Sequence, residues 1–399
     1  MGISKKIYFT IIFVVILVFA FADAVNTILM YNASETDYPK FSIYFRGLFE
    51  IFIIIWLLFY RKITIKEGLL LSLCFILSFS CIFAYWILSI STKDANFPAF
   101  FSLLNKTMFF FLCFIFINRA LKKINLVQIK YVFKTYEFII YINGICAILG
   151  LVFNLSLFKT YSTDRFGYIG FIPATNEASL FWLIALFYSF FIYKEEQKKL
   201  PLLFSIIACF LLGTKAAWIY VLISIIWFSY KFYPKMGKKI VVFSILGLGA
   251  FICIYYEKIS EYLKTLEIFS YFVWRLDKTD TLSILLSGRD EFIYRFFNTL
   301  SYWSLPNYLF GGILMEGKNP IITEMDLFDI IMIFGFVGAM IFLFIYKLIF
   351  SQIHKSYRVM FSFLFFTMAF ISGHVLWSAL NAVYLCLFIC KTKILNNEE

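Results

Sequence analysis

Charged residues are scarce in this chain. Asp, Glu, Lys and Arg make up only 15% of its 399 residues, against about 25% in ordinary soluble domains. Apolar residues make up 62%, and phenylalanine alone occupies 54 positions. A folded monomer exposes a large surface, and this composition supplies too little polar surface to cover it in water. The sequence therefore excludes a soluble enzyme and predicts a protein whose apolar surface faces a bilayer.

Histidine is nearly absent, with two residues, and each of the eight cysteines stands inside an apolar run. No cysteine has the spacing of a metal site with histidine, so we expect no metal site and interpret the cysteines as small core residues. The sequence also lacks internal repeats and any basic stripe with interleaved aromatics. The net charge of +12 therefore favours cations held at the cytoplasmic face of a membrane, and we expect no nucleic-acid partner.

Apolar segments of about 20 residues, long enough to cross a bilayer, recur along the chain. We place twelve spans near residues 7–30, 41–60, 68–91, 98–119, 131–158, 176–193, 199–213, 215–233, 239–256, 325–350, 357–373 and 377–391. The seventh and eighth should form a helical hairpin about Gly213. Lys5, Lys6 and the sequence Ala20-Phe21-Ala22 resemble a signal peptide, but the apolar run between them is at the long limit for one, which favours an uncleaved first helix.

The connecting loops fall into two alternating sets. One set is rich in Lys and Arg, at residues 61–66, 119–130, 194–199, 231–239 and 347–358; the other, including 35–37, 93–94 and 373–377, is poor in them. The positive-inside rule puts the first set and both termini in the cytoplasm. We therefore predict an all-α polytopic membrane protein with spans 1–9 in residues 1–256, a large helical outer loop at 257–324, and spans 10–12 with a cytoplasmic C-terminus in 325–399.

The large outer loop is rich in aromatic residues. From Arg289 onward, apolar side chains recur at helical spacing, at Phe292, Ile293, Phe296, Phe297, Leu300 and Trp303. This pattern predicts an amphipathic helix on the outer bilayer face, capped by Ser287 with Asp290; a second helix is expected over 259–269. Arg289 would stand in the first turn beside free backbone N–H groups, an arrangement suited to phosphate. The simpler interpretation is a solvated Arg on a helix face.

Eight ionisable residues fall in the outer halves or at the outer ends of the predicted spans: Asp23, Arg46, Glu50, Lys106, Glu177, Lys215, Asp326 and Asp329. Charges in hydrocarbon are costly and usually mark function, so the bias toward one side predicts a charge-lined cavity that opens outward. Simpler interpretations remain open. Arg46 and Glu50, four residues apart, are spaced to pair with each other; Asp23 and Lys106 are suited to pairing with other helices; interfacial exposure accounts for Glu177, Lys215 or Asp326 singly.

Four stretches of the chain resemble the O-antigen polymerase and ligase superfamily. They are GYIGFIPATNE (167–177), GTKAA (213–217), LSGR (286–289) and TEMDLFDIIMIFGFVG (323–338). Their order and spacing carry the resemblance from about residue 160 to 345. Ligases have a histidine at the polar start of the last stretch, where this chain has Glu324, followed by Asp326. This departure favours a polymerase, and His374 is the nearby histidine that could substitute in space.

The resemblance implies a GT-C-like helical fold in the bacterial inner membrane. It implies a glycosyltransferase that moves a growing glycan from undecaprenyl diphosphate onto another lipid-linked repeat unit at the periplasmic face, without metal or other cofactor. The implied partners are undecaprenyl-diphosphate-linked oligosaccharide, membrane lipid and a chain-length regulator. The polymer could be the O-antigen of lipopolysaccharide, a capsule or another surface glycan.

Roles follow for individual residues. Arg289, Arg165 and Lys215 are the cations expected at the leaving diphosphate. Glu324 is the first candidate for the general base and Asp326 the second. Asn176 and Glu177 are expected in the substrate site. Alternatives are an O-antigen ligase, a flippase for lipid-linked oligosaccharides, which would favour pseudo-repeated halves and midplane charges, and a purely structural membrane protein.

Overall fold

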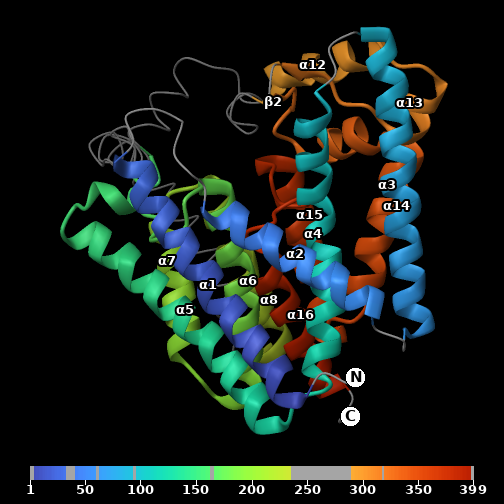
Figure 1. Cartoon of the computed structure of the whole chain (residues 1–399). Coiled ribbons are helices and arrows are strands. Elements are labelled where there is room, and N and C mark those ends of the chain that lie inside the picture. The colour runs from blue at the N-terminus through green and yellow to red at the C-terminus, as the bar shows by residue number, and fades with distance from the viewer. Residues whose placement is uncertain are drawn as a thin grey trace, which may run out of the picture. The chain divides into compact units, whose positions relative to one another are not determined.

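The computed structural model describes residues 4–32, 41–59, 63–92, 96–161, 166–234, 289–316 and 319–396 (Figure 1). This part of the chain is helical apart from its loops and one antiparallel hairpin of two-residue strands. Residue contacts divide the chain into two compact units. The first comprises Met1–Ile139 with Gly288–Glu399, and the second comprises Ile140–Ser287.

The first unit contains most of the long helices. Its elements are α1 (Lys5–Asn32), α2 (Phe41–Phe59), α3 (Ile65–Thr92), α4 (Phe97–Leu121), the first half of α5 (Leu126–Val152), α12 (Asp290–Ser301), α13 (Leu305–Phe310), β1 (Met315–Glu316), β2 (Asn319–Pro320), α14 (Asp326–Phe350), α15 (Lys355–Ser372) and α16 (Ala382–Asn396). The second unit contains the rest of α5, the 3-10 turn η1 (Ser156–Phe158), α6 (Thr175–Glu196), α7 (Leu200–Leu211) and α8 (Lys215–Phe232).

Seven of the described helices, α1 to α6 and α14, are long and apolar enough to cross a membrane. The prediction of a multi-pass helical membrane protein is therefore confirmed. Eleven of the twelve predicted spans each overlap one helix, and α7 with α8 forms the predicted hairpin. The ninth span, near 239–256, lies outside the described residues, as does the helix expected over 259–269. The total of twelve spans and the GT-C-like fold remain predictions.

Two predicted boundaries are displaced. The fifth helix ends at Val152 rather than near 158, because the chain then turns through η1 and pairs back on the second unit, with Lys159 opposite Tyr168. The last helix begins at Ala382 rather than near 377, because residues 374–377 form a loop bound to Asp326. In both places apolar residues continue beyond the helix, so hydropathy alone extends the span too far.

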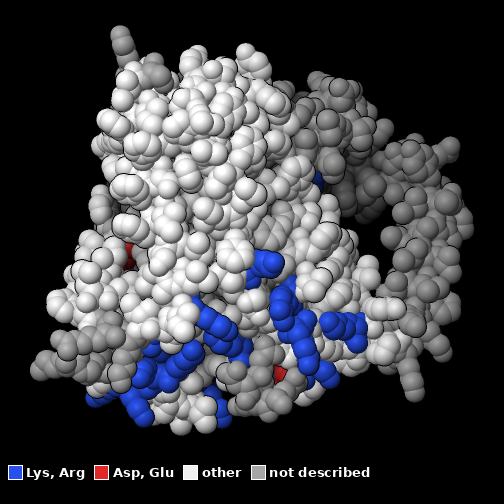
Figure 2. Space-filling model, turned by 90° about the vertical axis from the view of Figure 1, so that its right-hand side faces the viewer, with Lys and Arg blue, Asp and Glu red and all other residues white. Residues whose placement is uncertain are grey.

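Cations gather at one end of the first unit. Arg119, near the end of α4, pairs with Glu67 at the start of α3, and Lys393 of α16 bonds to both Asn118 and Gln352. Arg119 and Gln352 fall in loops that the sequence identifies as cation-rich, and Lys393 lies near the C-terminus, which the sequence assigns to the same side. Figure 2 shows most of the visible Lys and Arg side chains in the lower part of the face it presents, below a broad surface almost free of charge. This separation is typical of a helical protein in a bilayer.

Arg46 of α2 pairs with Asp23 of α1, with 2.7 Å between its NH2 atom and Oδ1 of the aspartate. The interpretation that Arg46 pairs with Glu50 is therefore wrong, whereas the pairing of Asp23 with another helix is confirmed. Asp23 is almost fully buried, and a buried carboxylate without a counter-charge costs several kcal/mol. Glu50, also buried, hydrogen-bonds to Asn105.

Gly335 interrupts α14 and lets α13 dock against it. Gly335 has a φ of +69°, and a Cβ at this position would lie 2.4 Å from the backbone nitrogen of Phe310. The interruption frees helical carbonyls, which then accept other donors. The N–H of Gly312 donates to Met332 O at 2.9 Å, and Cys81 Sγ donates to Ile333 O at 3.0 Å. Gly335, the first glycine of the G-x-x-G sequence, therefore fixes how α13 packs against α14.

We expect Gly335→Ala to destabilise the first unit by about 1–3 kcal/mol, because the residue would combine a left-handed backbone with a steric clash. Thermal unfolding of the purified protein in detergent measures this as a lower Tm. Gly47→Ala is the matched control, because a Cβ at Gly47 in α2 would meet nothing within 4 Å. Equal Tm values for the two variants would contradict the assigned role of Gly335.

Candidate functional site

The carboxylate of Asp326 accepts hydrogen bonds from four N–H donors. Asp326 is the first residue of α14 and is completely buried. Its oxygens accept the backbone N–H groups of His374 at 2.5 Å, Val375 at 2.6 Å and Leu376 at 2.6 Å, and the indole N–H of Trp377 at 2.8 Å. An ionised carboxylate is an acceptor only, so four donors match its capacity. Asp326 therefore anchors the loop 373–377 to the start of α14.

The turn before α14 is held by a second buried carboxylate. Oδ1 of Asp329 accepts the backbone N–H of Thr323 at 2.6 Å and the hydroxyl of Thr323 at 2.9 Å. This turn places Glu324 in a left-handed conformation, with φ of 57°. The Glu324 side chain remains 41% exposed. Of the three acidic residues here, Glu324 is the one that points outward.

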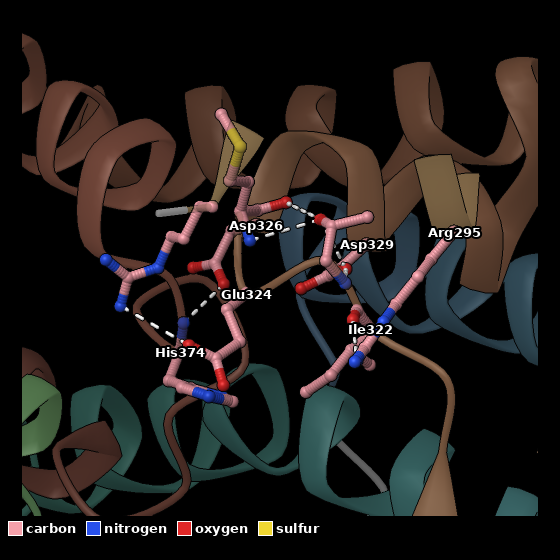
Figure 3. Close-up of polar contacts among 9 residues, drawn as sticks. Arg295, Ile322, Glu324, Asp326, Asp329 and His374 are labelled. Carbon is pink, nitrogen blue, oxygen red and sulfur yellow. Dashed lines mark hydrogen bonds and ion pairs between the residues drawn. The ribbon is translucent and has the colours of Figure 1, made fainter. Parts of the chain in front are cut away.

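Gly373 brings the loop 373–377 into backbone contact with Glu324. A Cβ at Gly373, where φ is +63°, would lie only 2.3 Å from the carbonyl oxygen of Glu324. This contact and the hydrogen bond to Asp326 put His374 beside the polar start of α14, and Figure 3 shows Glu324, Asp326 and His374 together. The sequence names His374 as a histidine that could substitute in space, and the fold places it beside Asp326 although the two are far apart in the chain.

Two cations flank this loop. The Arg289 guanidinium, whose side chain is 13% exposed, lies 3.5 Å from Glu324 Oε2. Nζ of Lys106, from α4, lies 4.6 Å from the centre of the Trp377 ring, close enough for a cation–π contact. The Trp377 ring is in turn 4.8 Å from the imidazole of His374. Arg289 and Glu324, predicted as site residues on separate stretches, are thus brought together, and Lys106 joins them.

Burial, followed by the charges of Lys106 and Arg289, lowers the pKa of His374 to about 4. The imidazole is therefore neutral at pH 7, and the positive charge of the site resides on the lysine and the arginine. Lys106 stands out in the sequence only as a lysine inside an apolar span. Its place beside His374 depends on how α4 packs, which the sequence does not show.

Arg289 is the N-cap residue of α12, which begins at Asp290. It is thus one position before the first turn in which the sequence placed it. The predicted cap, Ser287, lies outside the described residues. The predicted amphipathic helix is confirmed in its extent, and exposed Tyr294 and Phe297 contrast with buried Phe296 along it. Arg295 on the same helix donates to Ile322 O at 3.3 Å rather than to Glu324.

In the second unit, the starts of α6 and α8 lie side by side. Asn176 and Glu177 fall in the first turn of α6, and Lys215 is the first residue of α8. The hydroxyls of Ser179 and Thr214 are 3.3 Å apart, and Tyr220 OH donates to Ser179 O at 3.0 Å. The glycine-rich stretch is tied to the same turn, since Tyr168 N donates to Leu211 O at 2.7 Å.

The predicted site residues thus form two sets. Arg289, Glu324 and Asp326 lie at one end of the first unit, and Asn176, Glu177 and Lys215 lie at the neighbouring starts of α6 and α8 in the second. Arg165 lies outside the described residues, and a shared hollow for Arg165, Lys215 and Arg289 remains a prediction. Within the ranges that the structure describes, no cluster of three His, Cys, Asp or Glu side chains is placed to hold a metal ion.

We expect Asp326→Asn to lower the stability of the first unit by about 2 kcal/mol or more, because an amide group would turn one N–H toward N–H donors and leave buried donors unmatched. Glu324→Gln is the matched control, since its side chain is exposed. Thermal unfolding should show a clearly lower Tm for Asp326→Asn alone. Similar Tm values for both variants would argue against the anchoring role.

The His374 pKa predicts a pH dependence of stability. Because the folded pKa, about 4, lies below the unfolded value near 6.5, the unfolded chain binds the extra proton between these values. The stabilisation is present above pH 6.5 and is lost as pH falls toward 4, by up to about 3 kcal/mol. Tm measured from pH 7 to pH 4 should fall less in His374→Asn, which tolerates positive φ. His354→Asn, which retains a capping side chain for α15, should behave as wild type.

Comparison with protein-family models, with curated proteins and with solved structures finds no match for this chain. The resemblance of its four stretches to the polymerase and ligase superfamily therefore remains a prediction.

Proposed function

We propose that this chain is a polysaccharide polymerase, a glycosyltransferase that acts on lipid-linked oligosaccharides. A hydroxyl of one lipid-linked repeat unit attacks the anomeric carbon of the growing glycan. The bond from that carbon to the diphosphate oxygen breaks, undecaprenyl diphosphate leaves, and the hydroxyl proton passes to a carboxylate. The observation that carries the proposal is the 3.5 Å approach of Arg289 to Glu324 beside a second cation, Lys106.

The cations suit the leaving group. Negative charge grows on the diphosphate as the sugar departs, and fixed positive groups in a partly water-excluded site stabilise that charge most. Arg289 is largely enclosed, and its planar guanidinium can bind two phosphate oxygens at once. The Lys106 ammonium over the Trp377 ring supplies a second charge. This role for Lys106 adds to the three cations expected from the sequence.

Glu324 is the best placed proton acceptor. Asp326 is completely buried, and its carboxylate oxygens are occupied by hydrogen bonds from the loop 373–377. We therefore assign it a positioning role. Glu324 is 41% exposed and faces Arg289. A bound diphosphate competes for Arg289 and frees Glu324 to accept the hydroxyl proton. Substrate binding thereby prepares the base.

The setting in the membrane belongs to the same proposal. The site lies at the end of α14 opposite Lys347, and we assign this end to the periplasmic face of a bacterial inner membrane, with both termini cytoplasmic. The exposed aromatics of α12 then lie in the outer interface, where a polyprenyl carrier presents its diphosphate. A chain-length regulator would be a further partner.

An O-antigen ligase is a second candidate, and His374 is the observation that favours it. The neutral imidazole beside Glu324 can accept a proton or orient an acceptor hydroxyl, as the histidine that ligases carry in this region is expected to do. The products differ. Loss of a polymerase leaves single repeat units, whereas loss of a ligase leaves polymer that is not attached to core lipid.

We expect Arg289→Ala to reduce glycan polymerisation about 100- to 1000-fold, because one charge-stabilising group is lost. Cells that depend on each variant are compared by gel analysis of their surface glycan, with protein levels measured in parallel. Arg295→Gln is the matched control on α12, since Arg295 bonds to Ile322 O instead, and it should retain long chains. Long-chain glycan made at normal levels by Arg289→Ala would contradict the proposal.

Glu324→Gln should reduce polymerisation about 100- to 10,000-fold with little change in Tm, since it removes a proton acceptor and one long, partly exposed ion pair. The gel distinguishes the candidates: single repeat units on core lipid support a polymerase, and unattached long polymer supports a ligase. Normal glycan from this variant would rule out Glu324 as the base in either enzyme.

A further inference from the structure

A groove of about 550 Å³ runs between α14 and α15, and its described lining contains none of the site residues named above, although it includes Leu327 next to Asp326. Its volume is in the range of pockets that hold small ligands. Phe350 and Phe366 form part of its lining, with ring centres 6.1 Å apart. Leu343 extends the apolar wall along α14. The groove is therefore a preformed apolar surface suited to hydrocarbon.

One end of this groove is cationic. Lys347, in the last turn of α14, and Arg358, near the start of α15, both line it, together with the hydroxyl residue Ser351. None of its lining residues in the described part of the chain is acidic. Two cations and a hydroxyl at the mouth of an apolar groove complement a phosphate headgroup with attached acyl chains.

We propose that this groove is a binding site for an anionic phospholipid, whose phosphate lies between Lys347 and Arg358 and whose acyl chain lies against Phe350 and Phe366. Charge complementarity selects this occupant over a zwitterionic lipid, since the described lining offers the two cations no acidic partner. The position of the two cations favours phospholipid over the polyprenyl carrier. The groove's charge is at the end of α14 remote from Asp326, whereas the proposed site needs the carrier's diphosphate near Arg289.

The test uses the full-length protein purified in detergent and titrated with dioleoyl phosphatidylglycerol or dioleoyl phosphatidylcholine, which share acyl chains but differ in headgroup charge. Native mass spectrometry measures the bound lipid. We expect phosphatidylglycerol to bind roughly 10- to 30-fold more tightly, an advantage that Lys347→Gln with Arg358→Gln abolishes. Lys66→Gln with Lys123→Gln removes two exposed cations outside the groove and should preserve the advantage.

A filling variant separates charge from shape. Ser362→Trp keeps both cations but places a large ring in the groove, whose lining includes Ser362, and should weaken phosphatidylglycerol binding about tenfold. The proposal is overturned if both double variants weaken binding equally, since the effect would then be nonspecific charge. A competition experiment uses isotope-labelled phosphatidylglycerol bound to the protein. The proposal is also overturned if polyprenyl phosphate displaces this lipid at a lower concentration than unlabelled phosphatidylglycerol does, because the groove would then bind the carrier.

Discussion

The carboxylate of Asp326 is the interaction on which the polar end of the first unit depends. Its four N–H donors come from residues 374–377, and without it those donors would be buried and unmatched. The anchored loop carries His374 and supports Lys106 through the Trp377 ring. The chain segments that the proposed chemistry needs are thus positioned by a residue that takes no part in it.

Three acidic residues within six positions have separate tasks because their environments differ. Asp326 and Asp329 are buried and accept hydrogen bonds from backbone N–H groups. Each carboxylate stabilises a turn beside the start of α14, where backbone groups lack partners within the helix. Glu324 precedes both of them and has a left-handed conformation, with its side chain directed outward. Burial removes the first two from solution chemistry, while exposure leaves Glu324 to exchange a proton with a substrate.

Much of the fold follows from the sequence, since spans of about 20 apolar residues are a strong signal. The ends of helices give a weaker sequence signal. Residues 373–377 are apolar enough to extend a predicted span, and only their contacts with Asp326 reveal the turn.

Arg46 illustrates a second limit of prediction from sequence. Spacing along one helix favours Glu50, but a buried carboxylate on α1 binds Arg46, and partner choice between helices depends on packing. Arg289 was predicted as a site residue from its place at a helix start, and Glu324 from the resemblance of its stretch to the superfamily. Lys106 and His374 were not assigned to the site, because their approach requires α4 and the last loop to be in place.

The Arg289–Glu324 pair also constrains how such a site can work. At 3.5 Å, and with the Glu324 side chain 41% exposed, the pair is long and open to water on the carboxylate side, so a stronger anion can displace Glu324. A diphosphate with several charged oxygens binds Arg289 better than one carboxylate does. In the proposed reaction, this exchange releases the Glu324 carboxylate from Arg289 and makes it available as a base when the diphosphate binds. A buried, multiply bonded carboxylate such as Asp326 could not be released in this way, so the site needs one carboxylate of each kind.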